Sequence, residues 1–110
     1  MKMRVISQST ANRICDILLH TIEDGTATSA KIAGLAIGGK TGTSQKYDKE
    51  RHEYSKSKYI SSFVAFAPYP NAKICILVVI DEPKDEYYGG KVAAPVVKEI
   101  LEKGHQYIDF

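Results

Sequence analysis

The stretch that decides the fold is GLAIGGKTGT, Gly34–Thr43, near the middle of a chain of 110 residues. It fits the pattern G-x-x-x-x-G-K-[ST], in which a loop between a strand and a helix binds nucleotide phosphates. It also alternates its side chains with a period of two from Leu35 to Gly42, which is typical of a strand. The sequence on either side decides between these two interpretations.

A phosphate-binding loop needs an apolar strand that ends before Gly34 and a helix that begins near Lys40. The preceding residues, TATSAKIA (26–33), are small and polar, and the following residues, SQKYDKERHEY (44–54), carry no apolar stripe. We therefore predict a strand over 35–42. A nucleotide-binding protein remains the least favoured of three alternatives.

The rest of the chain predicts a simple order of elements. Apolar residues at three- and four-residue spacing predict an amphipathic helix over 8–24, which Ser7 or Ser9 can cap. Aromatic and β-branched residues predict strands over 59–67 and 73–81, separated by the turn PYPN (68–71). A second helix is expected over 89–103, with Pro95 in its first turn. The expected fold class is α+β, a three-stranded antiparallel sheet with N- and C-terminal helices in one domain, 1–110.

Composition excludes several classes of function. A net charge of +2 is too small to indicate a nucleic-acid partner, and the positive excess lies in 44–58, which we expect to be a solvated loop. The three histidines and two cysteines show no metal-ligand spacing, so no metal or other cofactor is expected. Apolar neighbours predict that Cys15 and Cys75 are both buried. The continuous apolar run over 73–81 predicts a strand covered on both faces or central in its sheet.

Three segments together carry a resemblance to a known family. They are GGKTGTSQK (38–46), YISSFVAFAPYPNAKICILVVIDEP (59–83) and YYGGKVAAPVVKEI (87–100). They closely resemble the last part of class B penicillin-binding proteins, the peptidoglycan D,D-transpeptidases of cell division and elongation, and the division type is preferred. The resemblance runs from about Ser7 to Ile100. It implies a partial β-lactamase/transpeptidase-like fold.

The resemblance also implies site residues and ligands. Lys40 and Thr43 would be catalytic, Lys40 by setting the charge around the nucleophile and Thr43 through its backbone N–H in the oxyanion hole. Lys40, Thr41, Gly42 and Thr43 would bind substrate, with the threonine hydroxyls on the terminal carboxylate. The ligands would be a peptidoglycan stem peptide and β-lactam antibiotics.

The match departs from the family pattern at the nucleophile. The family carries its nucleophile in an S-x-x-K motif and further polar groups in S-x-N, both upstream of K-T-G. This chain has no S-x-N, and its single S-x-x-K match, Ser55–Lys58, follows Thr43 in a polar context. We therefore expect a fragment that is inactive alone, from a parent enzyme that transfers acyl groups through serine. Met1 to Met3 would mark an artificial or internal start.

Partners and location follow from the same resemblance. The parent would be anchored in the bacterial cytoplasmic membrane with this soluble part on the periplasmic side, packed against the rest of the parent chain. In the family a strand from the beginning of the domain flanks the counterpart of 73–81, so an open edge there predicts a homo-oligomer or a domain swap. The second alternative function is a small module that binds peptidoglycan peptides or β-lactams without covalent chemistry.

Overall fold

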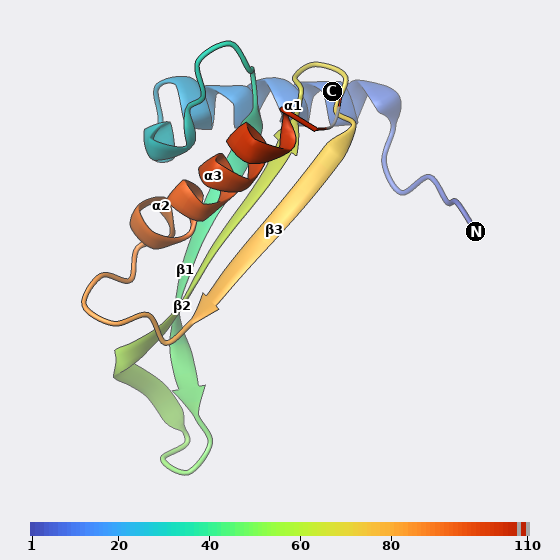
Figure 1. Cartoon of the computed structure of the whole chain (residues 1–110). Helices are drawn as coiled ribbons and strands as arrows, with labels where there is room; N and C mark the ends of the chain where they lie inside the picture. The colour runs from blue at the N-terminus through green and yellow to red at the C-terminus, as the bar shows by residue number, and fades with distance from the viewer. Residues whose placement is uncertain (108, 110) are drawn as a thin grey trace.

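A computed structural model describes residues 1–107 and 109 of the chain (Figure 1). Three strands form one antiparallel sheet in the order β1-β2-β3, so β2 is central. The elements, in chain order, are α1 (Gln8–Glu23), η1 (Thr28–Ala30), β1 (Gly38–Asp48), β2 (Glu53–Ala67), β3 (Ile74–Asp81), α2 (Gly89–Val92) and α3 (Ala94–Gly104). The predicted α+β architecture is confirmed.

Helix α1 forms as its periodicity predicts. The Ser7 hydroxyl oxygen accepts a hydrogen bond from the Thr10 amide at 3.1 Å, so Ser7 is the N-cap. Near the other end, the hydroxyl of Thr21 donates to the carbonyl of Gly39 and joins α1 to β1. Within the described part of the chain, α1 and the other helices lack the length and hydropathy to cross a bilayer.

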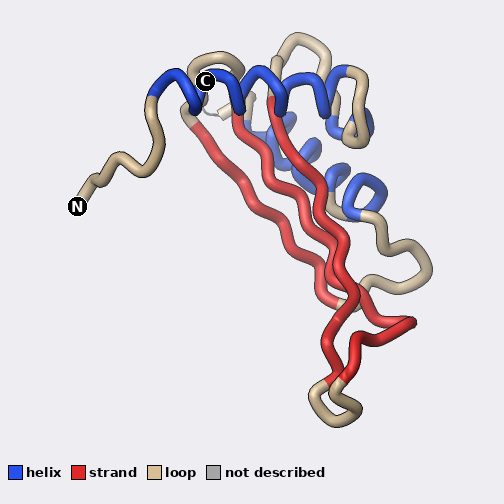
Figure 2. Tube along the Cα trace, turned by 180° about the vertical axis from the view of Figure 1, so that it is seen from behind, coloured by secondary structure: helices blue, strands red, loops and turns tan. Residues whose placement is uncertain are grey.

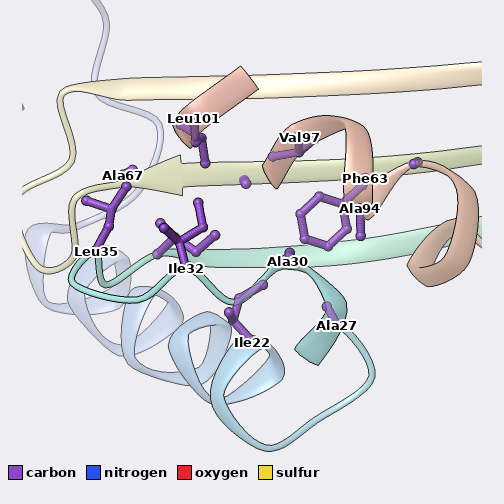
Figure 3. Close-up of a cluster of buried hydrophobic side chains, with 13 residues drawn as sticks. Ile22, Ala27, Ala30, Ile32, Leu35, Phe63, Ala67, Ala94, Val97 and Leu101 are labelled. Carbon is purple, nitrogen blue, oxygen red and sulfur yellow. The ribbon is translucent and has the colours of Figure 1, made fainter. Parts of the chain in front are cut away.

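The hydrophobic core lies between the sheet, helix α3 and the 22–37 segment, which runs from the end of α1 through η1 to the start of β1. Phe63 on β2 and Val97 and Leu101 on α3 are fully or almost fully buried (Figure 3). Burying side chains of this size contributes roughly 1.5–3 kcal/mol each. Smaller residues complete the cluster where helix and sheet approach closely, among them Ala27, Ala30, Ala65, Ala67, Ala93 and Ala94. The opposite face of the sheet is left open by α2 and α3 (Figure 2).

The expectation of a solvated loop over 44–58 is wrong. β1 continues to Asp48 and β2 begins at Glu53, so these residues form a hairpin that projects beyond the sheet (Figure 1). Its strands are mostly polar, and the rings of Tyr47 and Tyr54 meet edge to face with centroids 5.3 Å apart. This hairpin is stabilised by cross-strand side-chain pairs and not by burial of an apolar stripe. Hydrophobic periodicity therefore did not predict it.

The strand predicted over 35–42 begins three residues later, at Gly38. Leu35 instead forms an isolated bridge with Ile32, and both side chains are buried beneath the sheet. At the true start of β1, the aromatic ring of Phe66 lies over Gly38. A Cβ atom at Gly38 would come within 2.3 Å of that ring, so a larger residue there would require the ring of Phe66 to move.

The C-terminal helical region is split in two. α2 ends at Val92, and α3 begins at Ala94 with Pro95 in its first turn, as expected for proline. Because Pro95 has no N–H, it cannot bond to the carbonyl of Lys91, four residues earlier. The single helix predicted over 89–103 is therefore interrupted at Ala93.

Strand β3 is not covered on both faces, contrary to the expectation from its apolar run. Its residues alternate between half-buried and exposed, and it is the last strand of the described sheet. Cys75, Leu77 and Val79 point to the open face, so Cys75 is exposed. Cys15 on α1 is half-buried, and the prediction of two buried thiols is wrong. An apolar run shows that both faces of a strand could be buried. In the described structure only one face of β3 packs against other residues.

Candidate functional site

The predicted site residues lie along β1, whose outer edge pairs with no other described strand. Lys40 lies opposite Val64 of β2, and Thr43 lies opposite Ser61. Lys40 and Thr43 are therefore held in a regular, paired strand rather than in a loop. A phosphate-binding loop would require a helix to begin here, so the structure contradicts the nucleotide-binding alternative.

The backbone groups of Thr41 and Thr43 point to the unpaired edge. The carbonyl of Gly39 accepts a hydrogen bond from Thr21 of α1, so it points away from β2. In an antiparallel ladder, alternate residues direct both N–H and C=O to the same side. The N–H and C=O groups of Thr41 and Thr43 therefore face outward, where a bound ligand can reach them.

The side chains of this segment divide between the two faces of the sheet. Lys40 is exposed on the open face, and its ammonium group donates to the Thr41 carbonyl at 3.0 Å. Gly42 shares that face, where an added Cβ would meet the hydroxyl of Ser62 at 2.5 Å. The Thr41 and Thr43 side chains lie on the opposite face, toward α2. A ligand that contacts both Lys40 and Thr43 must therefore lie across the edge of β1.

A groove of about 500 Å³ runs beside the two threonines. This volume is in the range of sites that hold small ligands. Hydroxyl groups and the exposed ring of Tyr88 dominate its lining, which consists of Thr26, Thr28, Ser29, Thr41, Thr43, Tyr88, Gly89, Gly90 and Lys91.

Gly89 closes the groove against β1. Its amide donates to the hydroxyl oxygen of Thr43 at 3.0 Å. A Cβ atom at Gly89 would lie 2.5 Å from the Ser62 carbonyl oxygen and 2.7 Å from that of Gly42. These are backbone atoms that cannot move aside, so the close approach depends on glycine.

Two further hydroxyls hold the segment before α2. The hydroxyl of Ser61, which is completely buried, donates to the carbonyl of Tyr87. The hydroxyl of Ser29 donates to the carbonyl of Gly90. Residues 87–90 are thus attached to both β2 and the η1 segment, which fixes one wall of the groove.

Three tyrosines stack beside this wall. The rings of Tyr59 and Tyr87 are nearly parallel, with centroids 3.8 Å apart, and Tyr88 follows at 4.7 Å from Tyr87. Hydrogen bonds with Tyr88 and then with Tyr59 raise the pKa of Tyr87 to about 12. The ring of Tyr87 thus lies between Tyr59 and the exposed Tyr88.

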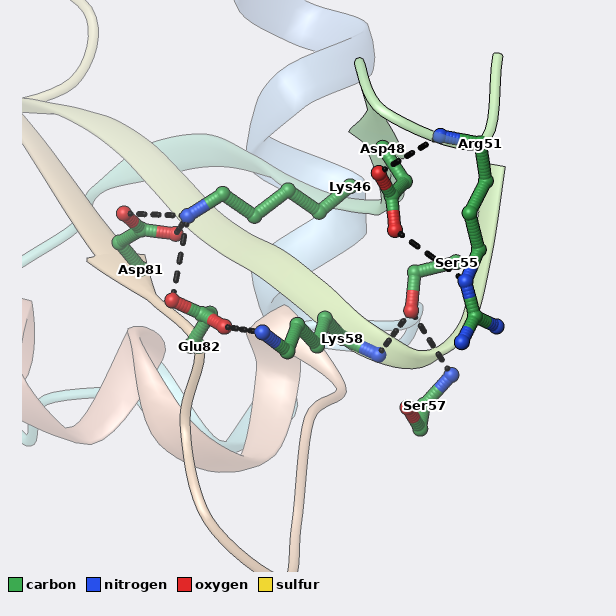
Figure 4. Close-up of polar contacts among 8 residues, drawn as sticks. All are labelled: Lys46, Asp48, Arg51, Ser55, Ser57, Lys58, Asp81 and Glu82. Carbon is green, nitrogen blue, oxygen red and sulfur yellow. Dashed lines mark hydrogen bonds and ion pairs between the residues drawn. The ribbon is translucent and has the colours of Figure 1, made fainter. Parts of the chain in front are cut away.

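An ion cluster joins the projecting hairpin to the end of β3 (Figure 4). The ammonium group of Lys46 contacts Asp81 at 2.9 Å and Glu82 at 3.2 Å, and Lys58 contacts Glu82 at 3.2 Å. Hydrogen bonds from the two lysines lower the pKa of Glu82, and the two carboxylates raise the pKa of Lys46. The cluster orients the hairpin relative to the sheet.

Ser55, the serine of the single S-x-x-K match, lies in this hairpin and does not line the groove. Its hydroxyl oxygen accepts hydrogen bonds from the amides of Ser57 at 3.2 Å and Lys58 at 3.0 Å (Figure 4). These contacts give Ser55 a local structural role. The described residues also include no group of three or more His, Cys, Asp or Glu side chains that could hold a metal.

Sequence reasoning identified β1 but missed most of the groove. The YYGG segment was recognised as part of the resemblance, without a role for Tyr88, Gly89 or Gly90. No sequence pattern indicated that Thr28 and Ser29 line the groove, because only tertiary packing brings the η1 segment next to β1.

Comparison with known proteins agrees with this geometry. The sequence profile of the penicillin binding protein transpeptidase domain matches residues 1–102. The chain is 46% identical over 100 residues to the peptidoglycan D,D-transpeptidase FtsI homolog of Chlorokybus atmophyticus, covering 90% of this chain and 15% of that protein. It is 39% identical over 100 residues to the probable peptidoglycan D,D-transpeptidase PenA of Neisseria flavescens, covering 89% of this chain and 24% of that protein.

Solved structures show the same fold. The apo transpeptidase domain of penicillin-binding protein 3 from Burkholderia pseudomallei superimposes with a TM-score of 0.84 at 35% identity, covering 97% of this chain and 32% of that one. Penicillin-binding protein 3 from Mycobacterium tuberculosis, complexed with aztreonam, gives a TM-score of 0.84 at 27% identity, covering 94% of this chain and 25% of that one. This chain therefore spans less than a third of these relatives, and it belongs to the transpeptidase-domain family of class B penicillin-binding proteins, matching the C-terminal part of the domain.

Proposed function

We propose that this chain supplies the substrate-binding strand of a peptidoglycan D,D-transpeptidase of the cell-division type. The observation that carries the proposal is the position of Thr43, whose backbone N–H faces the unpaired edge of β1 while its hydroxyl lines the groove. An N–H group at such an edge can stabilise the negative oxygen of an acyl-transfer transition state. The hydroxyl groups of Thr41 and Thr43 bind the terminal carboxylate of a stem peptide or of a β-lactam.

Lys40 provides the positive charge of the site. Its ammonium group is exposed and already contacts the Thr41 carbonyl, so it lies beside the same edge. A cation at this position attracts the acidic end of the peptide and favours the deprotonated form of a neighbouring nucleophile. Gly89 lets the 87–90 segment approach the strand closely, because an added Cβ there would lie 2.7 Å from the carbonyl oxygen of Gly42.

Binding to the chain itself tests these roles. NMR titration with benzylpenicillin or a D-alanyl-D-alanine peptide should shift the amide signals of Thr41 and Thr43. Lys40→Ala and Thr43→Val should each weaken binding about tenfold or more, because each removes a hydrogen bond to a charged group. Lys84→Ala is the matched control, since Lys84 is exposed, lies outside the groove and makes no ion pair among the described residues. Equal affinity in all variants would refute the assignment.

The chain is proposed to be catalytically incomplete. It has no S-x-N sequence, and its single S-x-x-K serine, Ser55, lies outside the groove. We expect no covalent adduct in intact mass spectrometry after incubation with benzylpenicillin. A stoichiometric adduct would show that the chain carries its own nucleophile.

The groove beside Thr41 and Thr43 supports weak non-covalent binding of a peptide or β-lactam without a nucleophile. In the complete protein, the remaining part of the transpeptidase would supply the nucleophile. Such a protein would hold this domain on the periplasmic side of the cytoplasmic membrane. Fractionation of cells that express the complete protein tests that location.

A further inference from the structure

The groove beside Thr41 and Thr43 carries a positive charge that the proposed function does not use. Of the described residues that line it, Lys91 alone is charged at neutral pH, and none is aspartate or glutamate. A cation in a hollow without acidic neighbours attracts anions. The two threonines are already assigned to the terminal carboxylate of the ligand. The charge of Lys91 is therefore available to a second anionic group.

Lys91 lies where the groove meets η1. The carbonyl of the preceding residue, Gly90, accepts a hydrogen bond from the hydroxyl of Ser29 in η1. A Cβ atom at Gly90 would also lie 2.9 Å from the carbonyl oxygen of Thr26. These contacts fix the backbone next to Lys91. A ligand that extends from β1 toward η1 can therefore contact Lys91 as well as the threonines of the strand.

Glu86 holds the Lys91 side chain without neutralising the groove. The carboxylate of Glu86 accepts hydrogen bonds from the amides of Tyr87 at 3.1 Å and Tyr88 at 3.4 Å, and it lies 3.5 Å from the ammonium group of Lys91. Glu86 itself is not part of the groove lining. The Lys91 side chain is 68% exposed, and an ammonium group has three N–H donors. Lys91 can thus keep this contact and donate to a ligand.

Hydroxyl groups with no protein partner lie in the same lining. The hydroxyls of Thr26, Thr28 and Thr41 form no hydrogen bond to another described residue. A hydroxyl can donate to a carboxylate, and such charge-assisted hydrogen bonds are stronger than neutral ones. Thr26 and Thr28 belong to the η1 side of the groove, next to Lys91. That side therefore combines a cation with free donors.

We propose that Lys91 determines specificity for ligands that carry a second carboxylate. The terminal carboxylate of such a stem peptide or β-lactam lies at Thr41 and Thr43, and a carboxylate on its side chain lies at Lys91. This inference rests on the function proposed above, because it takes the position of the first carboxylate from it. A ligand with one carboxylate leaves Lys91 without a contact.

Two matched β-lactams test the assignment in NMR titrations of this chain. Carbenicillin differs from benzylpenicillin by one added carboxylate on its side chain. The parent chain should bind carbenicillin about three- to fivefold more tightly, the gain expected from one exposed ion pair. The amide signal of Lys91 should shift further with carbenicillin than with benzylpenicillin. Lys91→Gln should remove the preference, whereas Lys91→Arg should retain it because the charge remains.

Two further variants separate a local contact from the net charge of the chain. Glu86→Gln keeps an oxygen that can accept from the amides before α2, but it removes the carboxylate that competes for Lys91. The preference for carbenicillin should therefore increase. Lys84→Gln removes the same unit of charge as Lys91→Gln at an exposed position outside the groove, so it should leave the preference unchanged.

Failure of this inference can be distinguished from failure of the proposed function. If benzylpenicillin shifts Thr41 and Thr43 but the parent shows no preference, or Lys91→Gln retains it, the inference is overturned. A preference that disappears in Lys40→Ala and persists in Lys91→Gln would assign the second carboxylate to the open face of the sheet. If neither ligand binds the parent chain, the proposed function fails and the inference fails with it.

Discussion

The amide of Gly89 donates a hydrogen bond to the hydroxyl oxygen of Thr43 across 3.0 Å, joining residues 46 positions apart in the chain. Because the Thr43 oxygen is the acceptor in this contact, its own hydrogen remains available to a ligand in the groove. The contact thus makes Thr43 a donor toward the groove. It also couples the geometry of β1 to that of the segment before α2.

Replacing Thr43 tests this contact. Thr43→Val keeps the shape of the side chain but removes the acceptor, so the amide of Gly89 should lose protection from hydrogen exchange. The free energy of unfolding should fall by about 1 kcal/mol. Thr43→Ser retains the oxygen and should retain the protection. Equal exchange of Gly89 in the two variants would show that the hydrogen bond does not form in solution.

Gly89→Ala should destabilise the fold by about 1–3 kcal/mol, measured by urea denaturation, because the new methyl group would overlap backbone atoms of both β1 and β2. The control is Gly104→Ala at the end of α3, where an added Cβ meets no atom within 4 Å. That substitution should not destabilise the chain. A similar loss in both variants would mean that the close approach at Gly89 is not tight.

The ion cluster predicts a dependence of stability on pH. The folded state lowers the pKa of Glu82 below its ordinary value of 4.5, through hydrogen bonds from Lys46 and Lys58. Its carboxylate therefore contributes stability above pH 4.5 that is lost as the pH falls through the lowered pKa. In urea denaturation at a series of pH values, Glu82→Gln should remove this component, and added salt should weaken it.

Glu53→Gln is the matched control for the ion cluster. Glu53 lies in the same hairpin but makes no ion pair among the described residues, so its substitution should leave the pH profile unchanged. Identical profiles for the parent chain and Glu82→Gln would contradict the assignment to Glu82.

The side chain of Tyr87 should lose its proton at a higher pH than an ordinary tyrosine. Hydrogen bonds with Tyr88 and Tyr59 raise its pKa from 10.0 to about 12, so ultraviolet absorbance should detect a tyrosinate that forms only in strong base. The associated stability is present below pH 10.0 and is lost as the pH rises through about 12. Tyr88→Phe should lower the pKa of Tyr87, whereas substitution of the exposed Tyr107 by Phe should not change it.

Sequence patterns were sufficient for elements with a clear period and a local cap. The helix after Ser7 follows from apolar spacing together with a hydroxyl N-cap. Lys40 could be placed in a strand because the residues after it, 44–54, have no apolar stripe that would allow a helix to begin there. These signals are local, so the sequence alone carries them.

Features that depend on contacts between distant segments were missed. The hairpin over 44–58 is stabilised by Lys46 and Lys58 with the acidic end of β3, which no local pattern reveals. The groove needs Ser29 beside Gly90, and these residues approach only after the helices pack on the sheet. Cys75 was predicted to be buried because its neighbours are apolar, although the chain covers only one face of β3.

Gly38, beneath the ring of Phe66, is the first residue of β1 in its pairing with β2. A slip of two residues along β2 would bring Lys40 opposite Phe66 and would carry Thr43 away from Ser61. A slip of one residue would exchange the two faces of the strand. The pairing of Gly38 with Phe66 therefore belongs to the same register that places Lys40 opposite Val64 and Thr43 opposite Ser61.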